Sequence, residues 1–193
     1  MRYFYLALAV FCVFISCSRK KYKNPHVEIQ TRSGDIEVEL FPANAPKSVA
    51  AFLANIDSGY YKNASFYRAL NEDNQPTGNA ETAMIQGGIW KTRHGLKIPG
   101  IRHESTQQTK LTHTNGTISF AREAPGTATT EFFICIGDQP GFDYGGINNP
   151  DGQGYAAFGR VVKGMELIKQ FYILPTNGDL LQPPVDILNI VRL

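Results

Sequence analysis

Arg68 is the residue of this 193-residue chain whose setting first suggests chemistry. It lies in the run Ser65–Leu70, where bulky and small side chains mix in a way that is typical of a β-strand. A guanidinium group is planar, permanently charged and multidentate, so it can hold a polar group in a fixed geometry. In isolation, an arginine between apolar neighbours on a strand is also simply a surface ion-pair residue. The segments around it must decide between these interpretations.

The run Met84–Gly88 combines an amide with an apolar side chain. Alternate residues of a strand point the same way, so we expect Met84 and Gln86 to share a face. The pair Gly87-Gly88 permits a close backbone approach or a positive φ. This strand therefore offers a hydrogen-bonding group beside an apolar wall.

The stretch Ile118–Ile136 reads as a strand, a wide loop and a second strand. The second strand carries bulky groups on both faces: Glu131, Phe133 and Cys135 on one, and Phe132, Ile134 and Ile136 on the other. We therefore expect one face to join the core and the other to line a pocket. Cys135 is interpreted as a small buried apolar residue rather than a catalytic thiol.

Four segments, in this order, together resemble the cyclophilins, a family of peptidyl-prolyl cis-trans isomerases. The segments are Ser65–Arg68, Met84–Gly88, Glu131–Cys135 (the family has Gln-Phe-Phe-Ile-Cys) and Phe158–Val162 with Gly164-Met165. The resemblance covers residues 26 to 193. It implies one mainly β domain: a closed antiparallel barrel of about eight strands, capped by helices near 46–58 and 164–172.

The resemblance also implies an activity and its residues. Cyclophilins rotate X–Pro peptide bonds, so Arg68 is the expected catalytic donor to the twisted amide, and Gln86 is expected to hold Arg68 or the substrate carbonyl. The expected substrate-binding residues are Met84, Ala121, Arg122, Glu131, Phe133 and Tyr155. Phe133 and Met84 would form the proline socket, while backbone groups of Ala121 and Arg122 would bind the peptide as an extended strand.

Four positions depart from the usual family pattern. They are Ala83 for Phe, Arg122 for Asn, Glu131 for Gln and Tyr155 for His. The small Ala83 is expected to widen the pocket. The carboxylate of Glu131 is expected either to pair with Arg68 and hold it, or to compete with substrate for it. A polar insertion, Asn71–Thr82, is expected beside the site.

Other elements follow from local patterns. Val27–Phe41 predicts a hairpin with its turn at Ser33-Gly34-Asp35, and Pro46 opens a helix with an apolar stripe that should plug an open end of the sheet. Lys91–Asn115 is weakly patterned, Asp138–Gly154 is a loop, and Val185–Val191 closes the sheet. The only tryptophan, Trp90, is interpreted as a packing residue.

Composition narrows the possible partners. The net charge is only +2, and no basic run is interleaved with aromatic residues, so we set nucleic-acid binding aside. His94, His103 and His113 have no metal-ligand spacing, so neither a metal nor a cofactor is expected. We expect a monomer whose partners are proline-containing polypeptides.

The N-terminus indicates export. Residues 1–16 have the short basic start and apolar core of a signal peptide, and the sequence around Cys17 resembles a bacterial lipoprotein processing site. Cys17 would then be lipidated, and residues 17–25 would tether the domain to a membrane, most simply facing the periplasm. The alternative is an ordinary signal peptide that is cleaved after a small residue. Both predict an extracytoplasmic domain.

Two other functions stay open at this point. The same groove could bind proline segments with little catalysis, as a binding module or chaperone-like lipoprotein. Alternatively, the barrel could serve only assembly, with the insertion 71–82 folded over Phe133. These readings differ in whether the groove is open and whether Arg68 matters to the rate.

Overall fold

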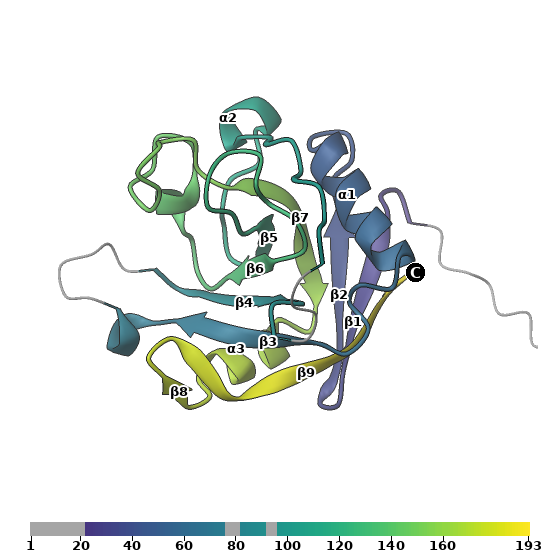
Figure 1. Ribbon diagram of the computed structural model, residues 1–193, viewed down its shortest axis with the longest axis vertical. Helices are drawn as coiled ribbons and strands as arrows, with labels where there is room; N and C mark the ends of the chain where they lie inside the picture. Colours follow the sequence, from purple (N-terminus) through teal and green to yellow (C-terminus); the bar gives the residue numbers. More distant parts are fainter. Residues whose placement is uncertain (1–21, 76–81, 92–95) are drawn as a thin grey trace, which may run out of the picture.

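Eight antiparallel strands close into a barrel in the computed structural model, which describes residues 22–75, 82–91 and 96–193 (Figure 1). Their order is β1-β2-β7-β5-β6-β4-β3-β9, and β9 also pairs with β1. The closed barrel confirms the predicted fold class. The predicted signal peptide and Cys17 lie outside the described residues, as do residues 76–81 of the insertion.

The strands and helices have the following bounds. The barrel strands are β1 (His26–Thr31), β2 (Gly34–Leu40), β3 (Ala64–Leu70), β4 (Met84–Gly88), β5 (Thr117–Phe120), β6 (Phe132–Cys135), β7 (Ala156–Lys163) and β9 (Leu180–Arg192). A two-residue strand, β8 (Thr176–Asn177), pairs with β9 alone. The helices are α1 (Pro46–Asp57), α2 (Thr106–Thr109) and α3 (Met165–Tyr172), with single turns η1 (Glu72–Asn74) and η2 (Pro140–Phe142).

The bounds differ from expectation at three places. The first hairpin turns one residue earlier than predicted, because Gly34 already pairs with Thr31. The region Lys91–Asn115 contains the short α2, which its weak pattern did not predict. The last strand begins at Leu180 rather than Val185, and this longer strand carries the β8–β9 hairpin. None of the helices in the described ranges is long and apolar enough to cross a membrane.

The barrel interior is filled by aromatic rings that α1 helps to enclose. Phe52 of α1 lies 5.0 Å from Phe158 and 5.8 Å from Phe132, measured between ring centroids. Phe132 is fully buried and also packs against Phe66 at 5.9 Å. In Figure 1, α1 lies against one end of the barrel, as its apolar stripe predicted. The interior is therefore a packed aromatic core.

The N-terminus of α1 is satisfied by a residue far away in sequence. The preceding Ala45 offers no side-chain cap. Instead, the carboxylate of Glu104 accepts hydrogen bonds from the backbone N–H of Ser48 at 2.7 Å and of Lys47 at 3.2 Å. A carboxylate at this position satisfies unpaired N–H groups and interacts favourably with the helix dipole. This contact fixes the otherwise irregular segment before α2 against the helix.

A β-bulge in β3 changes which side chains face outward. Phe66 pairs with Gly87 and Arg68 pairs with Gln86, so Tyr67 is the extra residue. Phe66 then points into the barrel core, whereas both Tyr67 and Arg68 border the outer surface. Simple alternation along β3 would put Phe66 and Arg68 on the same face, and it fails here because of the bulge. The bulge is what places two polar side chains side by side.

Candidate active site

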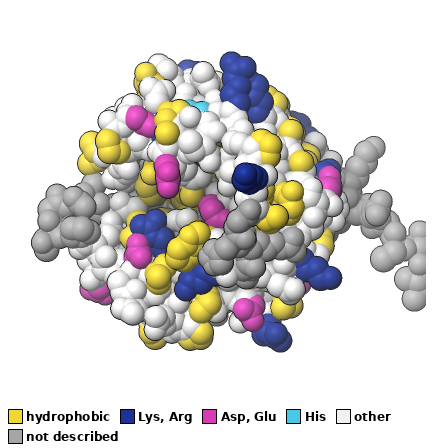
Figure 2. Space-filling view, in the orientation of Figure 1, with side chains coloured by type: hydrophobic (Ala, Val, Ile, Leu, Met, Phe, Trp, Pro, Cys, Tyr) yellow, Lys and Arg dark blue, Asp and Glu magenta, His cyan; other side chains and the backbone are white. Residues whose placement is uncertain are grey.

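A cleft of about 1030 Å³ runs along the outer faces of the central strands. It is lined by every predicted catalytic and substrate-binding residue: Arg68, Gln86, Met84, Ala121, Arg122, Glu131, Phe133 and Tyr155. Ala83 is not among the lining residues, whereas its neighbours Thr82 and Met84 are. On the face shown in Figure 2, hydrophobic, basic and acidic side chains are mixed.

One end of the cleft is apolar. Met84, Phe133, Cys135 and Phe142 form a buried cluster separate from the barrel core. The ring of Phe133 lies 4.9 Å from Phe142 and 5.4 Å from Tyr155, the latter edge to face. Phe142 was missed by sequence reasoning because it lies in η2, inside a segment that reads only as a loop. The one sequence feature that could have indicated a buried position for Phe142 is that it is a large apolar residue in a polar segment.

The underside of Phe133 rests on a buried histidine. His113 stacks on this ring with centroids 5.8 Å apart and an interplanar angle of 12°. Its Nδ1 lies 2.7 Å from Asp143 Oδ1, and its Nε2 lies 3.0 Å from Ser119 Oγ. Ser119 is fully buried, so this Ser–His–Asp arrangement cannot reach a substrate as a nucleophile would have to. It serves to hold the Phe133 ring in place.

Neither a cysteine nucleophile nor a metal site is available among the described residues of the cleft. Cys135 is fully buried, and burial raises the pKa of its thiol far above the usual range, so the reactive thiolate does not form near neutral pH. Among the described residues, no three His, Cys, Asp or Glu side chains could together hold a metal ion. The cleft therefore offers hydrogen bonds and apolar surface.

Arg68 is held at two of its nitrogens. Its Nε donates to Asp179 Oδ2 at 2.7 Å, and its Nη1 donates to Gln86 Oε1 at 3.1 Å. Gln86 therefore holds Arg68 in this structure, which was one of the two expected roles. Asp179 was not predicted, because it is 111 residues away in sequence and lies at the end of the turn before β9.

The hydrogen bonds continue from Gln86 to Glu131. Gln86 Nε2 donates to the Tyr67 hydroxyl at 2.6 Å, and Tyr67 donates to Glu131 Oε2 at 2.7 Å. Burial raises the pKa of Tyr67 well above its usual range, so its hydroxyl stays protonated and keeps this donor role. Because the Gln86 amide donates to Tyr67 with its nitrogen, its oxygen is the atom that faces Arg68. The expectation that Glu131 pairs with or competes for Arg68 was wrong, because Tyr67 lies between them.

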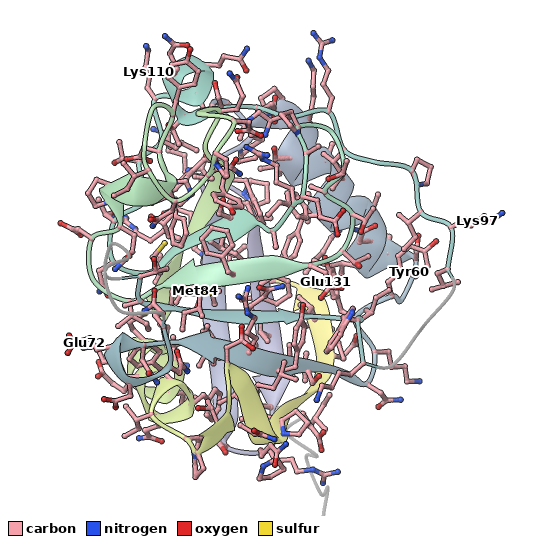
Figure 3. All side chains as sticks on the ribbon, turned by 60° about the vertical axis from the view of Figure 1, so that its left-hand side comes forward. Tyr60, Glu72, Met84, Lys97, Lys110 and Glu131 are labelled. Carbon is pink, nitrogen blue, oxygen red and sulfur yellow. The ribbon has the colours of Figure 1, made fainter. Side chains whose placement is uncertain are left out.

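Gly88 makes room for the carboxylate of Glu131. Its φ is +149°, and a Cβ at this position would lie 2.3 Å from Glu131 Oε2. The next residue, Ile89, donates its backbone N–H to Glu131 Oε1 at 2.9 Å. Gly88 thus shows both the positive φ and the close approach that its sequence predicted. In Figure 3, Met84 and Glu131 lie toward the two ends of the β4–β6 pair that borders the cleft.

Glu131 should make stability depend on pH. Burial raises the pKa of Glu131 above its ordinary value of 4.5. Between the unfolded pKa and the higher folded pKa, the folded state binds more protons, so the stability that this group contributes is greatest at low pH and falls as pH rises. We expect the unfolding free energy of the wild type, minus that of Glu131→Gln, to decrease from pH 4 to pH 7. Urea denaturation at four pH values measures this difference, and a constant or increasing difference would contradict the expectation.

Comparison with known proteins identifies the family. The model of the family described as cyclophilin type peptidyl-prolyl cis-trans isomerase/CLD matches residues 26–192. The chain belongs to the cyclophilin family. It is 31% identical over 155 residues to a peptidyl-prolyl cis-trans isomerase of Acinetobacter baylyi, a match that covers 80% of this chain and 75% of that protein. It is 32% identical over 150 residues to peptidyl-prolyl cis-trans isomerase B of Escherichia coli, covering 74% of this chain and 80% of that protein.

Solved structures agree with this family. A cyclophilin type peptidyl-prolyl cis-trans isomerase of Cryptosporidium parvum superposes with a TM-score of 0.69 at 25% identity, covering 88% of this chain and 97% of that one. A second crystal structure, determined in the presence of the dipeptide Ala-Pro, gives a TM-score of 0.66 at 26% identity and covers 86% and 97%. Like these relatives, this cyclophilin is a peptidyl-prolyl cis-trans isomerase.

One backbone group of the edge that was expected to bind peptide is already engaged within the protein. The backbone N–H of Ala121 donates to the Glu131 carbonyl at 2.9 Å, so it is not available to a peptide. The Arg122 guanidinium turns away to Asp151, at 2.7 Å from Nη1, and to the Gly154 carbonyl, at 3.0 Å from Nε. It also lies 5.3 Å from the Tyr155 ring centroid. Arg122 therefore fastens the Asp138–Gly154 loop beside the cleft.

Two further features border the cleft. Trp90 is 49% exposed and lies 5.2 Å from the Tyr67 ring, so its interpretation as a packing residue was wrong in part: it lines the cleft. The described base of the insertion is fastened by hydrogen bonds between the Gln75 amide and the backbone of Thr82, at 2.7 and 3.2 Å. The described residues leave the cleft open.

Proposed function

We propose that this cyclophilin isomerises X–Pro bonds by donating a hydrogen bond from Arg68 to the amide nitrogen of the twisted bond. The observation that carries the proposal is the pairing of a fixed guanidinium with an apolar pocket. Arg68 is held by Asp179 and Gln86, and it borders the same cleft as Met84 and Phe133. A proline ring can occupy the apolar end while its amide lies within reach of the cation.

The physical reason lies in the amide itself. Resonance gives the C–N bond a rotation barrier of about 18–20 kcal/mol. A twisted amide loses this resonance, and its nitrogen regains a lone pair that accepts a hydrogen bond. A donor that meets this lone pair only in the twisted state lowers the barrier without tightening ground-state binding. No proton is transferred and no covalent intermediate forms, so the mechanism needs neither Cys135 nor Ser119, both of which are fully buried.

The donor needs a free N–H group. Nε and Nη1 of Arg68 are engaged by protein atoms, and within the described residues Nη2 makes no hydrogen bond to a protein atom. Nη2 is therefore the group that we assign to the substrate. A peptide bound as an extended strand along β5 would use the carbonyl of Ala121, since its N–H is already engaged.

The experiment that tests this proposal is an isomerisation assay with a proline-containing peptide. It compares the wild type with Arg68→Ala and with Arg192→Ala, whose ion pair with Asp57 involves the far end of β9. Equal rates for the wild type and Arg68→Ala would refute the role of Arg68.

We also propose that the enzyme acts on exported proteins from a membrane surface. The support is the sequence alone: an apolar run after a basic start, followed by Ser16-Cys17 and then Arg19-Lys20-Lys21. Acyl chains on Cys17 combined with adjacent basic residues would give two signals for stable attachment. The substrates would then be polypeptides that fold outside the cytoplasm.

The anchor gives a direct prediction. Cys17→Ser should move the protein from the membrane fraction to the soluble fraction and remove the mass of the lipid. Cys12→Ser is the matched control, since that cysteine lies within the expected signal peptide and should leave anchoring unchanged. Detergent-phase partitioning and mass spectrometry of protein from a bacterial host measure both effects. If Cys17→Ser partitions like the wild type, the lipid anchor is wrong.

A further inference from the structure

Asp179 is joined to the Arg68 strand by its backbone as well as by its side chain. It lies between β8 and β9, in a hairpin whose first strand, among the described residues, pairs only with β9. The carbonyl of Asp179 accepts a hydrogen bond from the backbone N–H of Ala69 at 2.9 Å. Arg68 itself pairs in register with Leu180. The main chain therefore fixes where the Asp179 carboxylate can reach.

That carboxylate holds the nitrogen of Arg68 nearest to its aliphatic stem. The distance from Arg68 Nε to Asp179 Oδ2 is 2.7 Å, and Gln86 holds Nη1 at 3.1 Å. A guanidinium group is planar and rigid, so two fixed nitrogens also define the position of the third. Asp179 and Gln86 together leave Nη2 as the donor for substrate.

Asp179 is the only acidic residue among the described residues that contacts Arg68. Glu131, the other acid close to the network, is engaged by Tyr67 and the backbone of Ile89. Asp151 is engaged by Arg122. The side chains of Arg68 and Asp179 are 34% and 36% exposed, so this ion pair contributes little to the stability of the fold. Its main effect is on the position of the Arg68 guanidinium.

We propose that Asp179 is a positioning residue for catalysis: it restricts the Arg68 side chain to the rotamer that presents Nη2 to the twisted amide. This inference rests on the proposed role of Arg68. Without Asp179, Arg68 keeps its charge and its contact with Gln86 but samples other rotamers. Catalysis depends steeply on such placement, and an error of about 1 Å can cost about 10²-fold in rate. Because the donor acts on the twisted state, the loss falls on kcat rather than on KM.

The test uses the full protein and three variants. Asp179→Ala is expected to lower kcat about tenfold with KM changed less than about twofold. Asp179→Asn is expected to recover most of the rate, since its amide oxygen can still accept from Arg68 Nε. Asp186→Asn is the control, because Asp186 lies on β9 and, like Asp179, pairs with an arginine, Arg32, but this pair is exposed and away from the cleft. Thermal midpoints are measured for all, and if Asp179→Ala does not fold, Asp179→Ser carries the same expectation.

The double variant separates this inference from the proposal on which it rests. In an Arg68→Ala background, the further change Asp179→Ala should have no additional effect on the rate. If Arg68→Ala is as fast as the wild type, the role of Arg68 itself fails. If Arg68→Ala is slow and Asp179→Ala has the wild-type kcat, only the positioning role is overturned. The positioning role is also overturned if Asp179→Ala lowers the rate by the same factor in the Arg68→Ala background as in the wild type. It is overturned as well if the whole effect of Asp179→Ala is on KM.

Discussion

Arg68→Ala is expected to lower kcat/KM for a proline-containing peptide by about 10²–10³-fold. Removing one preorganised donor from a developing acceptor costs about 3–4 kcal/mol of transition-state stabilisation. Stability should change little, because the Arg68 side chain is 34% exposed and its ion pair with Asp179 is solvated. The variant therefore separates an effect on catalysis from an effect on folding.

The measurement is the rate of cis-to-trans conversion at several enzyme concentrations, with the thermal midpoint of each variant recorded beside it. Arg192→Ala is the matched control and should keep the wild-type rate, since it also loses one arginine and one ion pair. Arg68→Lys should restore only a small part of the rate, because an ammonium group lacks the planar fork that Asp179 and Gln86 hold. An Arg68→Lys enzyme with full activity would contradict the requirement for that geometry.

Two adjacent phenylalanines should give opposite results. Phe132→Ala removes a ring from the barrel core, where it packs on Phe52, Tyr61 and Phe66, and should cost about 3–5 kcal/mol of unfolding free energy. The folded fraction should keep its activity within about threefold. Phe133→Ala removes the floor of the proline pocket. Losing the burial of a proline ring there should cost about 2 kcal/mol of binding, or about thirtyfold in kcat/KM.

The two variants control for each other, since both remove the same ring from the same strand. Urea denaturation gives the stability of each, and the isomerisation assay, corrected for the folded fraction, gives the activity. Phe133→Leu should fall between the wild type and Phe133→Ala in activity, because leucine keeps part of the apolar surface. If Phe132→Ala and Phe133→Ala lose equal activity per folded molecule, the cleft face of β6 has no special role.

Local patterns predicted the parts of this fold that depend on neighbouring residues. The alternation in β6 put Phe132 and Phe133 on opposite faces, and the structure has Phe132 in the barrel core and Phe133 in the cleft. Pro46 and its apolar stripe located α1, and Gly88 was expected to adopt an unusual φ or a close approach. In each case the physical cause lies within a few positions of the residue, so the sequence alone is sufficient.

The parts that could not be predicted depend on contacts between distant segments. The bulge that turns both Tyr67 and Arg68 outward arises from pairing between β3 and β4, and simple alternation gives the wrong face. Asp179 reaches Arg68 across 111 positions, and nothing in an Asn-Gly-Asp turn indicates an arginine partner. Glu131 was placed in the cleft correctly, but its partner could be found only from the three-dimensional positions of Tyr67 and Gly88.

The central claim is that Arg68 binds the twisted amide and adds little to binding of the planar one. Titration of an Ala-Pro-containing peptide, followed by NMR at equilibrium, gives the dissociation constant and the exchange rate from the same samples. The account predicts that Arg68→Ala weakens ground-state binding by less than about threefold while it slows exchange on the enzyme by about 10²-fold or more. A variant whose dissociation constant rises by the same factor by which kcat/KM falls would contradict the account, because Arg68 would then be a residue of uniform binding.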